Sequence, residues 1–198
     1  MKKLMKNTLV IVVLFTALLA NANTSLNDLN DVRKTVLTLN DVKQGDELLI
    51  KNAYGIILYK ETIKNSGSYN KGFDLTELPK GDYFFELNKD FQIKIIPFNV
   101  SNNVVAFKSD KETTIFKPSI RNKENKVYIN KLSLNLEPLE INVYYENLDI
   151  NDFELIYSET LEGTNNISRL LNLDIEKKGK YRIETKTEGR TFVDYIQF

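Results

Sequence analysis

The stretch FDLTELPKGDYFFELN, residues 73–88, decides the fold of this 198-residue chain. An alternation of apolar residues breaks at Leu-Pro-Lys-Gly-Asp and resumes at Tyr83. Pro79 has no N–H to give to a strand ladder and presets a turn, while Gly81 supplies backbone freedom and is a candidate for a positive φ. The pattern predicts two strands joined by a sharp turn.

The same pattern recurs 98 residues later, so the chain contains two copies of one unit. Residues 58–86 align with residues 156–184 without a gap. Identical pairs at this offset include Tyr59/Tyr157, Glu61/Glu159, Thr62/Thr160, Lys80/Lys178, Gly81/Gly179 and Tyr83/Tyr181. Solenoid units are about 20 to 50 residues long, so this longer period indicates two tandem domains.

The rest of the chain carries a strand signal. Short β-branched and aromatic runs with partial alternation are separated by polar, Gly- or Asn-containing pieces, and no segment sustains an apolar helical stripe. We therefore predict an all-β protein of two tandem Ig-like or fibronectin-like β-sandwich domains. The expected division is a signal peptide at 1–22, a polar leader at 23–33, and domains at 34–110 and 111–198.

A tyrosine that opens a strand after a crossover turn, two residues before a core position, is the tyrosine corner of Ig-like sandwiches. Lys-Gly-x-Tyr occurs in both copies. We therefore expect Tyr83 and Tyr181 to be corner tyrosines, with Pro79, Gly81 and Gly179 shaping the turns before them. The alternative is an ordinary hairpin with an incidental tyrosine.

The segment DLTELPKGDYFFEL, with the β-rich tail that follows it, resembles the C-terminal sorting domain of the type IX secretion system. The chain also looks like small exported two-repeat Ig-like β-sandwich proteins of uncharacterised function. The resemblance covers residues 49 to 100 well and the second copy more loosely. It implies a β-sandwich fold and carries no activity.

The N-terminus has the three parts of a signal peptide. Lys2, Lys3 and Lys6 form a positive region, Leu9–Leu19 is an apolar core, and Ala20-Asn21-Ala22 gives the small-x-small cleavage pattern. A retained membrane anchor is the alternative, but a spanning helix needs about 20 apolar residues. We expect an exported chain that does not span the membrane after cleavage and resides in the periplasm, on the cell surface or in the medium.

The amino-acid composition excludes several classes of partner and of catalytic chemistry. Removal of the three N-terminal lysines leaves 24 basic against 27 acidic side chains, which is a net charge of −3 and argues against nucleic acid as a partner. The chain has no His and no Cys, so imidazole and thiol catalysis, thiolate zinc sites and disulfides are excluded. We expect no enzyme activity and no cofactor.

One acidic segment, LDINDFE, has oxygen-ligand spacing that calcium could use. The weak calcium candidates are Asp149, Asn151, Asp152 and Glu154. The segment lacks the EF-hand glycine and the spacing of its bidentate Glu, and it lies where the second copy lengthens a hairpin. Asn-Asp turn chemistry is therefore the favoured interpretation.

Two further groups of residues could have a functional role. Glu61 and Glu159 could be paired catalytic carboxylates, but they occupy equivalent places in separate domains. A sugar-stacking platform is the alternative to core packing for Tyr54, Tyr59, Tyr69, Tyr128, Tyr144, Tyr145 and Tyr157.

The function that we expect is that of an exported non-catalytic module of the cell envelope, binding or structural, whose partner is an unknown protein or glycan. The alternatives are a carbohydrate-binding or inhibitor-like accessory protein, which needs exposed aromatics or a protruding loop, and a relative of the sorting domain. An enzyme needs a pocket lined by carboxylates. Fold alone decides none of these.

Overall fold

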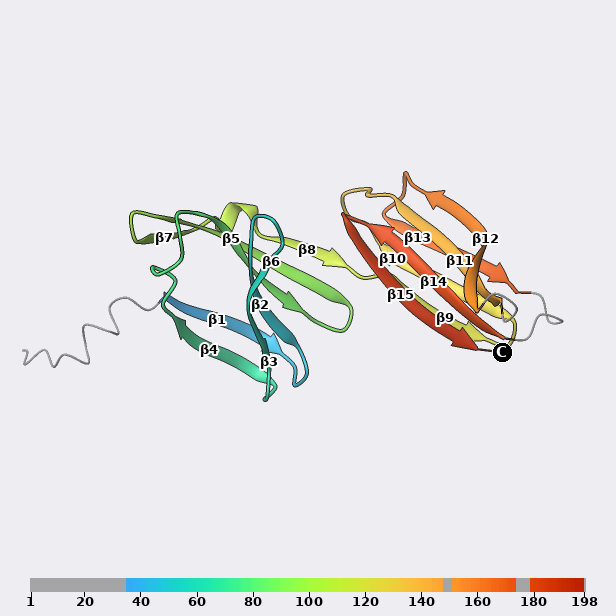
Figure 1. The fold of residues 1–198 in the computed structure, drawn as a ribbon, viewed down its shortest axis with the longest axis horizontal. Coiled ribbons are helices and arrows are strands. Elements are labelled where there is room, and N and C mark those ends of the chain that lie inside the picture. Colours follow the sequence, from blue (N-terminus) through green and yellow to red (C-terminus); the bar gives the residue numbers. More distant parts are fainter. Residues whose placement is uncertain (1–34, 148–150, 174–178, 198) are drawn as a thin grey trace, which may run out of the picture.

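The computed structural model describes residues 35–147, 151–173 and 179–197. Its strands form two bodies that lie end to end, joined by the chain between β8 and β9 (Figure 1). No helix in these three ranges is long and apolar enough to span a membrane. The predicted signal peptide at 1–22 and polar leader at 23–33 lie outside the described residues.

The first unit packs two antiparallel sheets face to face. One sheet pairs β1 with β4, and the other has the order β3-β2-β5-β6-β7, with β8 also paired to β6. A short 3₁₀ turn, η1 (Ser109–Lys111), precedes β8. The strands are β1 (Thr35–Val42), β2 (Glu47–Asn52), β3 (Ile57–Thr62), β4 (Gly67–Phe73), β5 (Gly81–Asn88), β6 (Gln92–Ser101), β7 (Val104–Phe107) and β8 (Thr113–Phe116).

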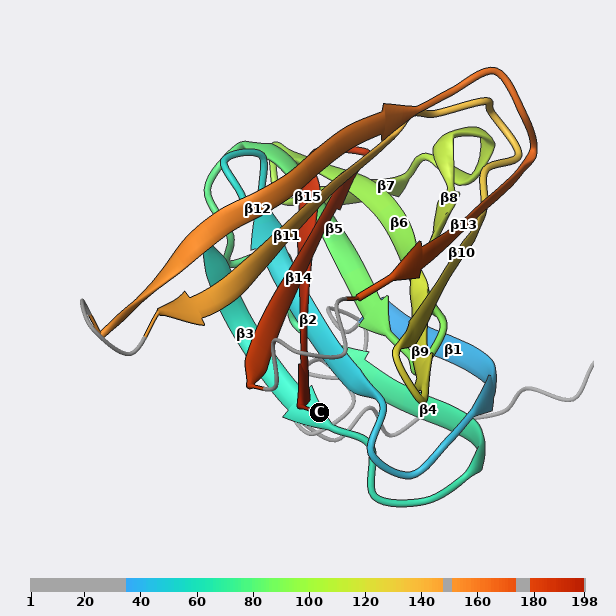
Figure 2. The ribbon, with the colours of Figure 1, turned by 90° about the vertical axis from the view of Figure 1, so that its right-hand side faces the viewer.

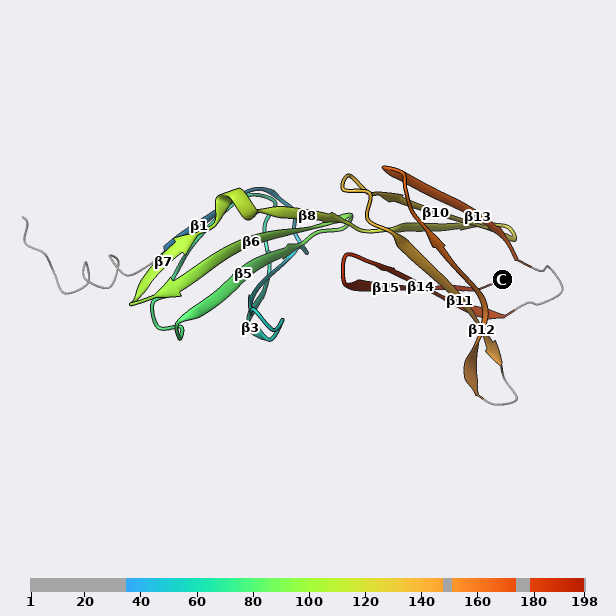
Figure 3. The same ribbon diagram turned by 90° about the horizontal axis from the view of Figure 1, so that it is seen from above.

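The second unit also has two antiparallel sheets, with the orders β13-β10-β9 and β12-β11-β14-β15. Seen from above, they form separate layers, and the β11–β12 hairpin extends beyond the other strands (Figure 3). The strands are β9 (Ser119–Lys123), β10 (Lys126–Leu132), β11 (Leu139–Asn147), β12 (Asp152–Leu161), β13 (Asn166–Asn172), β14 (Lys180–Thr187) and β15 (Arg190–Gln197).

Both units share one strand order. The pair β4-β1 lies against β3-β2-β5-β6 in the first unit, and β13-β10 lies against β12-β11-β14-β15 in the second. This is an Ig/fibronectin-like β-sandwich, so the fold class that the sequence predicted is confirmed. Viewed along the long axis of the molecule, the strands of the two units run at different angles (Figure 2).

The two copies differ in the length of one hairpin. Ile50 pairs with Phe85 in the first unit, and Val143 pairs with Ile183 in the second. Ile50 and Val143 are 93 positions apart, whereas Phe85 and Ile183 are 98 apart, so the second copy has five more residues between these strands. The β11–β12 hairpin contains the extra residues.

The alternation in residues 73–88 follows from the burial of one face of β5. Tyr83, Phe85 and Leu87 point into the first core, and Phe85 is fully buried between the rings of Phe73 and Phe98, each 5.2 Å away between centroids. Side chains two apart along a strand lie on the same face, which explains the spacing. The second unit has its own core on β10, β11, β13 and β14.

The boundary between the units lies further along the chain than the sequence predicted. Residues 111–198 were assigned to the second domain, yet β8 pairs with β6 from Gln92/Phe116 to Ile95/Thr113. Ile115 of β8 is buried. The first unit therefore extends to Phe116, because a strand pairing that local sequence does not reveal adds β8 to its sheet.

The turn before β5 has the geometry of a tyrosine corner. The Tyr83 hydroxyl donates a 2.7 Å hydrogen bond to the carbonyl oxygen of Pro79, and the Tyr83 ring stacks on Phe98 with centroids 5.6 Å apart. Tyr181 stands near the start of β14 and is fully buried, with its ring 5.0 Å from that of Tyr145. The turn residues 174–178 before Tyr181 lie outside the described residues.

The two turn glycines are not equivalent. Gly81 does not have a positive φ, and a Cβ there would lie 3.5 Å from the Tyr83 ring, an ordinary contact. The expectation of a positive φ at Gly81 is therefore wrong, because Pro79 and the bond to Tyr83 already turn the chain. Gly179 has a φ of 159°, and a Cβ there would lie 3.0 Å from the Tyr145 ring.

An ion-paired cluster joins the two units. Arg190 at the start of β15 places Nη2 2.5 Å from Oε2 of Glu86 on β5, and Lys51 places Nζ 2.9 Å from Oε1 of the same carboxylate. The Glu86 side chain is only 5% exposed. Burial alone would raise the pKa of Glu86, but the bonds from Arg190 and Lys51 outweigh it and hold the pKa below its usual value.

Candidate functional site

A cluster of polar side chains closes the first sandwich at the edge where β3 faces β4. Lys71 on β4 places Nζ 2.6 Å from the Tyr59 hydroxyl and 2.6 Å from Oε2 of Glu61, both on β3. The hydroxyls of Tyr59 and Tyr69 donate to the same Glu61 oxygen. Since β3 and β4 belong to different sheets, these residues form an inter-sheet clasp.

The clasp fixes the charge state of its members. Hydrogen bonds from Lys71 and then from Tyr59 lower the pKa of Glu61 to about 2, against the desolvation that would raise it. The Glu61 carboxylate in turn raises the pKa of Lys71. Burial, and then the bond to Glu61, raise the pKa of Tyr59. At neutral pH the carboxylate and the ammonium are both charged and bonded to each other.

The second unit repeats the clasp with arginine in place of lysine. The Tyr157 hydroxyl donates a 2.5 Å bond to Oε2 of Glu159, and Nη2 of Arg169 lies 3.0 Å from the Tyr157 oxygen and 2.6 Å from Oε1 of Glu159. Arg169 stands on β13 and its two partners on β12, so this clasp also bridges two sheets. The paired acids Glu61 and Glu159 therefore each belong to the clasp of their own unit.

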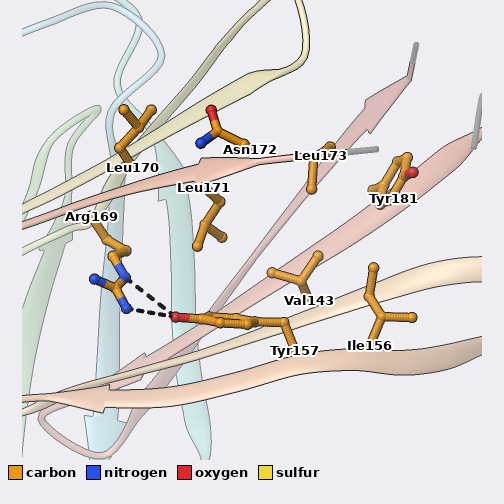
Figure 4. Close-up of a pocket in the computed structure, with 9 residues that line it drawn as sticks. All are labelled: Val143, Ile156, Tyr157, Arg169, Leu170, Leu171, Asn172, Leu173 and Tyr181. Atoms are coloured by element: carbon orange, nitrogen blue, oxygen red, sulfur yellow. Dashed lines mark hydrogen bonds between the residues drawn. The ribbon is translucent and has the colours of Figure 1, made fainter. Parts of the chain in front are cut away.

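Beside the second clasp, a cleft of about 620 Å³ opens between the sheets. Tyr157 and Arg169 lie at one end of it, joined by hydrogen bonds, and mostly apolar side chains, with Asn172 among them, line the remainder (Figure 4). The lining is Val143, Ile156, Tyr157, Arg169, Leu170, Leu171, Asn172, Leu173 and Tyr181.

The first unit fills the equivalent place with an aromatic ring. Phe73 stands where the second unit has Leu171, at the same pairing position on the neighbouring strand. Its ring lies 5.4 Å from that of Tyr59 in an edge-on contact and 5.2 Å from that of Phe85. In the second unit the smaller Leu171 side chain lines the cleft at this place.

A second candidate surface lies on the outer face of the sheet β12-β11-β14-β15. Two cationic side chains stand among aromatic rings there, and we call the group the aromatic–cation face. Its members are Tyr144 of β11, Phe153 and Leu155 of β12, Lys180 and Arg182 of β14, and Tyr195 of β15.

Both cations of this face contact two rings each. Nζ of Lys180 lies 4.8 Å from the ring centroid of Tyr195 and 5.7 Å from that of Phe153. The guanidinium of Arg182 lies 4.2 Å from the Tyr144 centroid and 4.9 Å from the Phe153 centroid. These are cation–π distances. The rings and their cations therefore hold one another in place on the sheet.

The face is accessible to a ligand. Tyr195 is 56% exposed and Leu155 is 50% exposed. The rings of Phe153 and Tyr195 lie 6.0 Å apart in an edge-on arrangement. Large exposed apolar side chains that gather with fixed polar groups are typical of binding surfaces.

The first unit does not carry such a face. At the positions of Phe153, Lys180, Arg182 and Tyr195, the 98-residue offset places Gly55, Asp82, Phe84 and Pro97. By strand pairing, the equivalent of Tyr144 in the first unit is Lys51. Lys51 bonds to Glu86. Two units of one fold thus differ most clearly in the chemistry of this surface.

Of the calcium candidates, Asn151 lies in the turn of the β11–β12 hairpin, and Asp152 and Glu154 lie on β12. Asn151 has a φ of 53° in the β11–β12 hairpin, and Oδ1 of Asp152 accepts a 2.7 Å bond from the backbone N–H of Phe153. Oε2 of Glu154 lies 3.5 Å from Nδ2 of Asn147. Asp149 lies outside the described residues. Within the described ranges, no group of three or more His, Cys, Asp or Glu is placed to hold a metal ion.

The tyrosines of the alternative sugar-stacking platform are dispersed over the structure. Tyr59, Tyr69 and Tyr157 belong to the clasps, and Tyr145 packs on Tyr181. Tyr54 is 90% exposed at the β2–β3 turn, and Tyr128 is exposed on β10. Only Tyr144 of that group belongs to the aromatic–cation face. The sequence analysis did not identify Phe153, Lys180, Arg182 and Tyr195 as site residues. The one indication in the sequence was that these positions differ in residue type from their equivalents in the first copy.

Comparisons with known proteins add little to what the strand order shows about the fold. No protein-family model and no curated protein matches the chain. Among solved structures it is similar to the BSP domain of a biofilm associated protein, with 18% identity over 82% of this chain and 27% of that chain, at a TM-score of 0.28. It is similar also to the FN1-FN3 domains of chicken CNTN1, with 12% identity over 82% of this chain and 63% of that chain, at a TM-score of 0.27.

The chain therefore spans less than two thirds of the length of either structure. Both TM-scores are low, so the assignment of the fold rests on the strand order and pairing described above.

Proposed function

We propose that this chain is an exported, non-catalytic binding module of the cell envelope, and that its second unit carries the binding surface. The observation that carries the proposal is the aromatic–cation face, in which Tyr195 and Leu155 are half exposed around fixed cations. The first unit, with Asp82 and Pro97 at equivalent positions, serves as a support. The partner is a glycan or a protein of the envelope.

The electrostatics of the clasps favour binding over catalysis. A general acid or base works best when its pKa lies near the working pH. The pKa of Glu61 is held at about 2, and those of Tyr59 and Tyr157 are raised above the usual tyrosine value. The members of each clasp are bonded to one another across the two sheets, and in the second unit Tyr157 and Arg169 do so at one end of the cleft, so we assign the clasps the role of holding the sheets together.

Export is inferred from the sequence of residues 1–22. The two hydrophobic cores and the two clasps hold a chain without cysteine together in an oxidising compartment. The test is mass spectrometry of fractionated source cells. An N-terminus at Asn23 in the periplasmic, surface or secreted fraction supports export, whereas an intact Met1 on a membrane-embedded product contradicts it.

A structural role as a spacer is the second candidate, favoured by one observation. The Arg190–Glu86 ion pair links the units end to end, and the Glu86 carboxylate is almost fully buried by its partners. We propose no sorting role, because the LPKGDYFFEL segment that resembles a sorting domain is accounted for by the turn and the Tyr83 bond.

A further inference from the structure

We propose that the aromatic–cation face binds an acidic polysaccharide, with a uronic acid unit placed over the exposed ring of Tyr195, beside Phe153, and its carboxylate at Lys180. This inference rests on the proposed function and names its ligand class. It is drawn from the chemistry of six side chains on four adjacent strands.

The rings supply the part of the site that recognises a sugar. The face of an aromatic ring is electron-rich and attracts the weakly positive C–H groups on one side of a pyranose. Tyr195 is 56% exposed, and its ring lies 6.0 Å from that of Phe153. Because the cations brace both rings, little side-chain freedom is lost when a ligand binds.

Lys180 supplies the preference for an acidic sugar. Its ammonium lies between two rings and makes no ion pair with any carboxylate in the described part of the chain. An anion can therefore bind Lys180 without first displacing a protein carboxylate.

Arg182 adds a second donor to the same face. Its Nε lies 3.1 Å from Oε1 of Glu184 in an ion pair, and a quarter of the side chain stays exposed. Guanidinium groups are well suited to carboxylate recognition. The cations are balanced by Glu184 and by Glu146, which pairs with Phe153 across the strands. This balance favours a chain of single carboxylates over a densely sulfated one.

The size of the face argues for a glycan and against a protein partner. A standard protein interface buries about 800 Å² and about 20–30 residues on each side. Here six residues make up the aromatic–cation face. The next row of the sheet has one apolar side chain, the half-exposed Val193, beside Asn142 and Glu184, and the row beyond it holds the Glu140–Lys186 ion pair at 2.9 Å. One or two sugar units match an area of this size.

The experiment measures binding of the mature chain, residues 23–198, to three soluble polymers by affinity electrophoresis. Polygalacturonate presents sugar rings with carboxylates, its methyl ester presents the same rings without charge, and polyglutamate presents carboxylates without rings. We expect polygalacturonate to bind about tenfold more tightly than the ester, which corresponds to about 1.4 kcal/mol. Polyglutamate should bind most weakly.

Variants separate the rings from the charge. Tyr195→Ala should weaken binding of polygalacturonate and of its ester about tenfold. Lys180→Gln should reduce the preference for the acidic polymer, with the remainder supplied by Arg182, and should affect the ester much less. Tyr54→Ala is the matched control for an exposed ring and Lys126→Gln for a lysine on the opposite sheet, and both should bind like the parent. Circular dichroism confirms that each variant is folded.

The inference is overturned if folded parent protein binds none of the three polymers, if Tyr195→Ala binds like the parent, or if Lys126→Gln loses as much as Lys180→Gln. The proposed function has a separate readout, which is co-sedimentation with isolated envelopes. Sedimentation that protease treatment of the envelopes abolishes would identify a protein partner, so the glycan inference fails while the binding function stands.

Discussion

The hydroxyl of Tyr83 and the carbonyl oxygen of Pro79 lie 2.7 Å apart, and this bond ties the turn before β5 to the core of the first unit. Tyr83 is buried, so in the folded chain its hydroxyl bonds to the Pro79 carbonyl oxygen and not to water. Loss of the hydroxyl leaves that carbonyl without its partner.

Tyr83→Phe should therefore lower the free energy of unfolding by about 1–3 kcal/mol. Tyr181→Phe should act likewise on the second unit, since Tyr181 is fully buried at the equivalent position. Urea unfolding of each variant beside the parent measures the change. If both variants unfold with the parent, these tyrosines are ordinary strand residues.

The two turn glycines should respond differently to valine. Gly179→Val should cost at least about 2 kcal/mol, because a β-branched residue is disfavoured at a φ of 159° and its Cβ would meet the Tyr145 ring at 3.0 Å. Gly81→Val should cost less, because Gly81 has no positive φ and its Cβ position is in ordinary contact. Urea midpoints compare the two, and equal losses would contradict this account.

The Glu61 clasp should make stability depend on acid pH. The pKa of Glu61 is lowered in the folded chain from its ordinary 4.5 to about 2, so the folded state binds the proton less readily than the unfolded state does. Its contribution, about 1–2 kcal/mol after solvent screening, is present above pH 4.5 and is lost as the pH falls towards 2.

Glu61→Gln should thus destabilise the chain at pH 7 and differ little from the parent near pH 2. Urea unfolding at pH 7, 4 and 2 gives the comparison, and Glu77→Gln, at an exposed position, is the matched control. A constant difference at all three pH values would show that the carboxylate charge is not what stabilises the clasp.

The difference between Phe73 and Leu171 predicts a reciprocal pair of variants. Leu171→Phe should place a ring in the cleft beside Tyr157, as Phe73 does beside Tyr59, and raise stability by about 1 kcal/mol. Phe73→Leu should open a cavity in the first unit and cost about 1–2 kcal/mol. Thermal unfolding of both variants tests this, and a destabilised Leu171→Phe would mean that the cleft cannot accept a ring.

The ion pair between Arg190 and Glu86 should restrict movement between the units. Arg190→Ala removes one of the two cations that bond to a carboxylate exposed by only 5%, and should cost about 1–3 kcal/mol. Small-angle X-ray scattering should show a broader range of shapes than the parent gives. Arg121→Ala, at an exposed position on β9, is the control. An unchanged scattering profile for Arg190→Ala would mean that other contacts hold the units.

The features of the fold that could be predicted from the sequence are those that local periodicity encodes. The alternation around Phe85 and the recurrence of Lys-Gly-x-Tyr identified two β-sandwich units, because residues two apart on a strand share a face. The sequence did not place β8, because the pairing of Ile115 with Ile93 joins strands that are not adjacent in the chain. It offered Gly81 as a candidate for a positive φ, which the residue does not have, and the bond between Tyr83 and Pro79 makes one unnecessary there.

The aromatic–cation face could not be predicted from the sequence, and the reason is geometric. Tyr144, Phe153, Arg182 and Tyr195 come from four strands, and their meeting depends on strand register, including a bulge after Val143. A shift of one residue would turn these side chains to the opposite face.

The most direct test of the account is co-sedimentation of the mature chain with envelopes isolated from its source cells. The account predicts that the parent and Tyr54→Ala sediment with the envelopes, and that folded Tyr195→Ala and Phe153→Ala remain in the supernatant. Sedimentation of the Tyr195 and Phe153 variants to the same extent as the parent would contradict the claim that the aromatic–cation face is the binding surface.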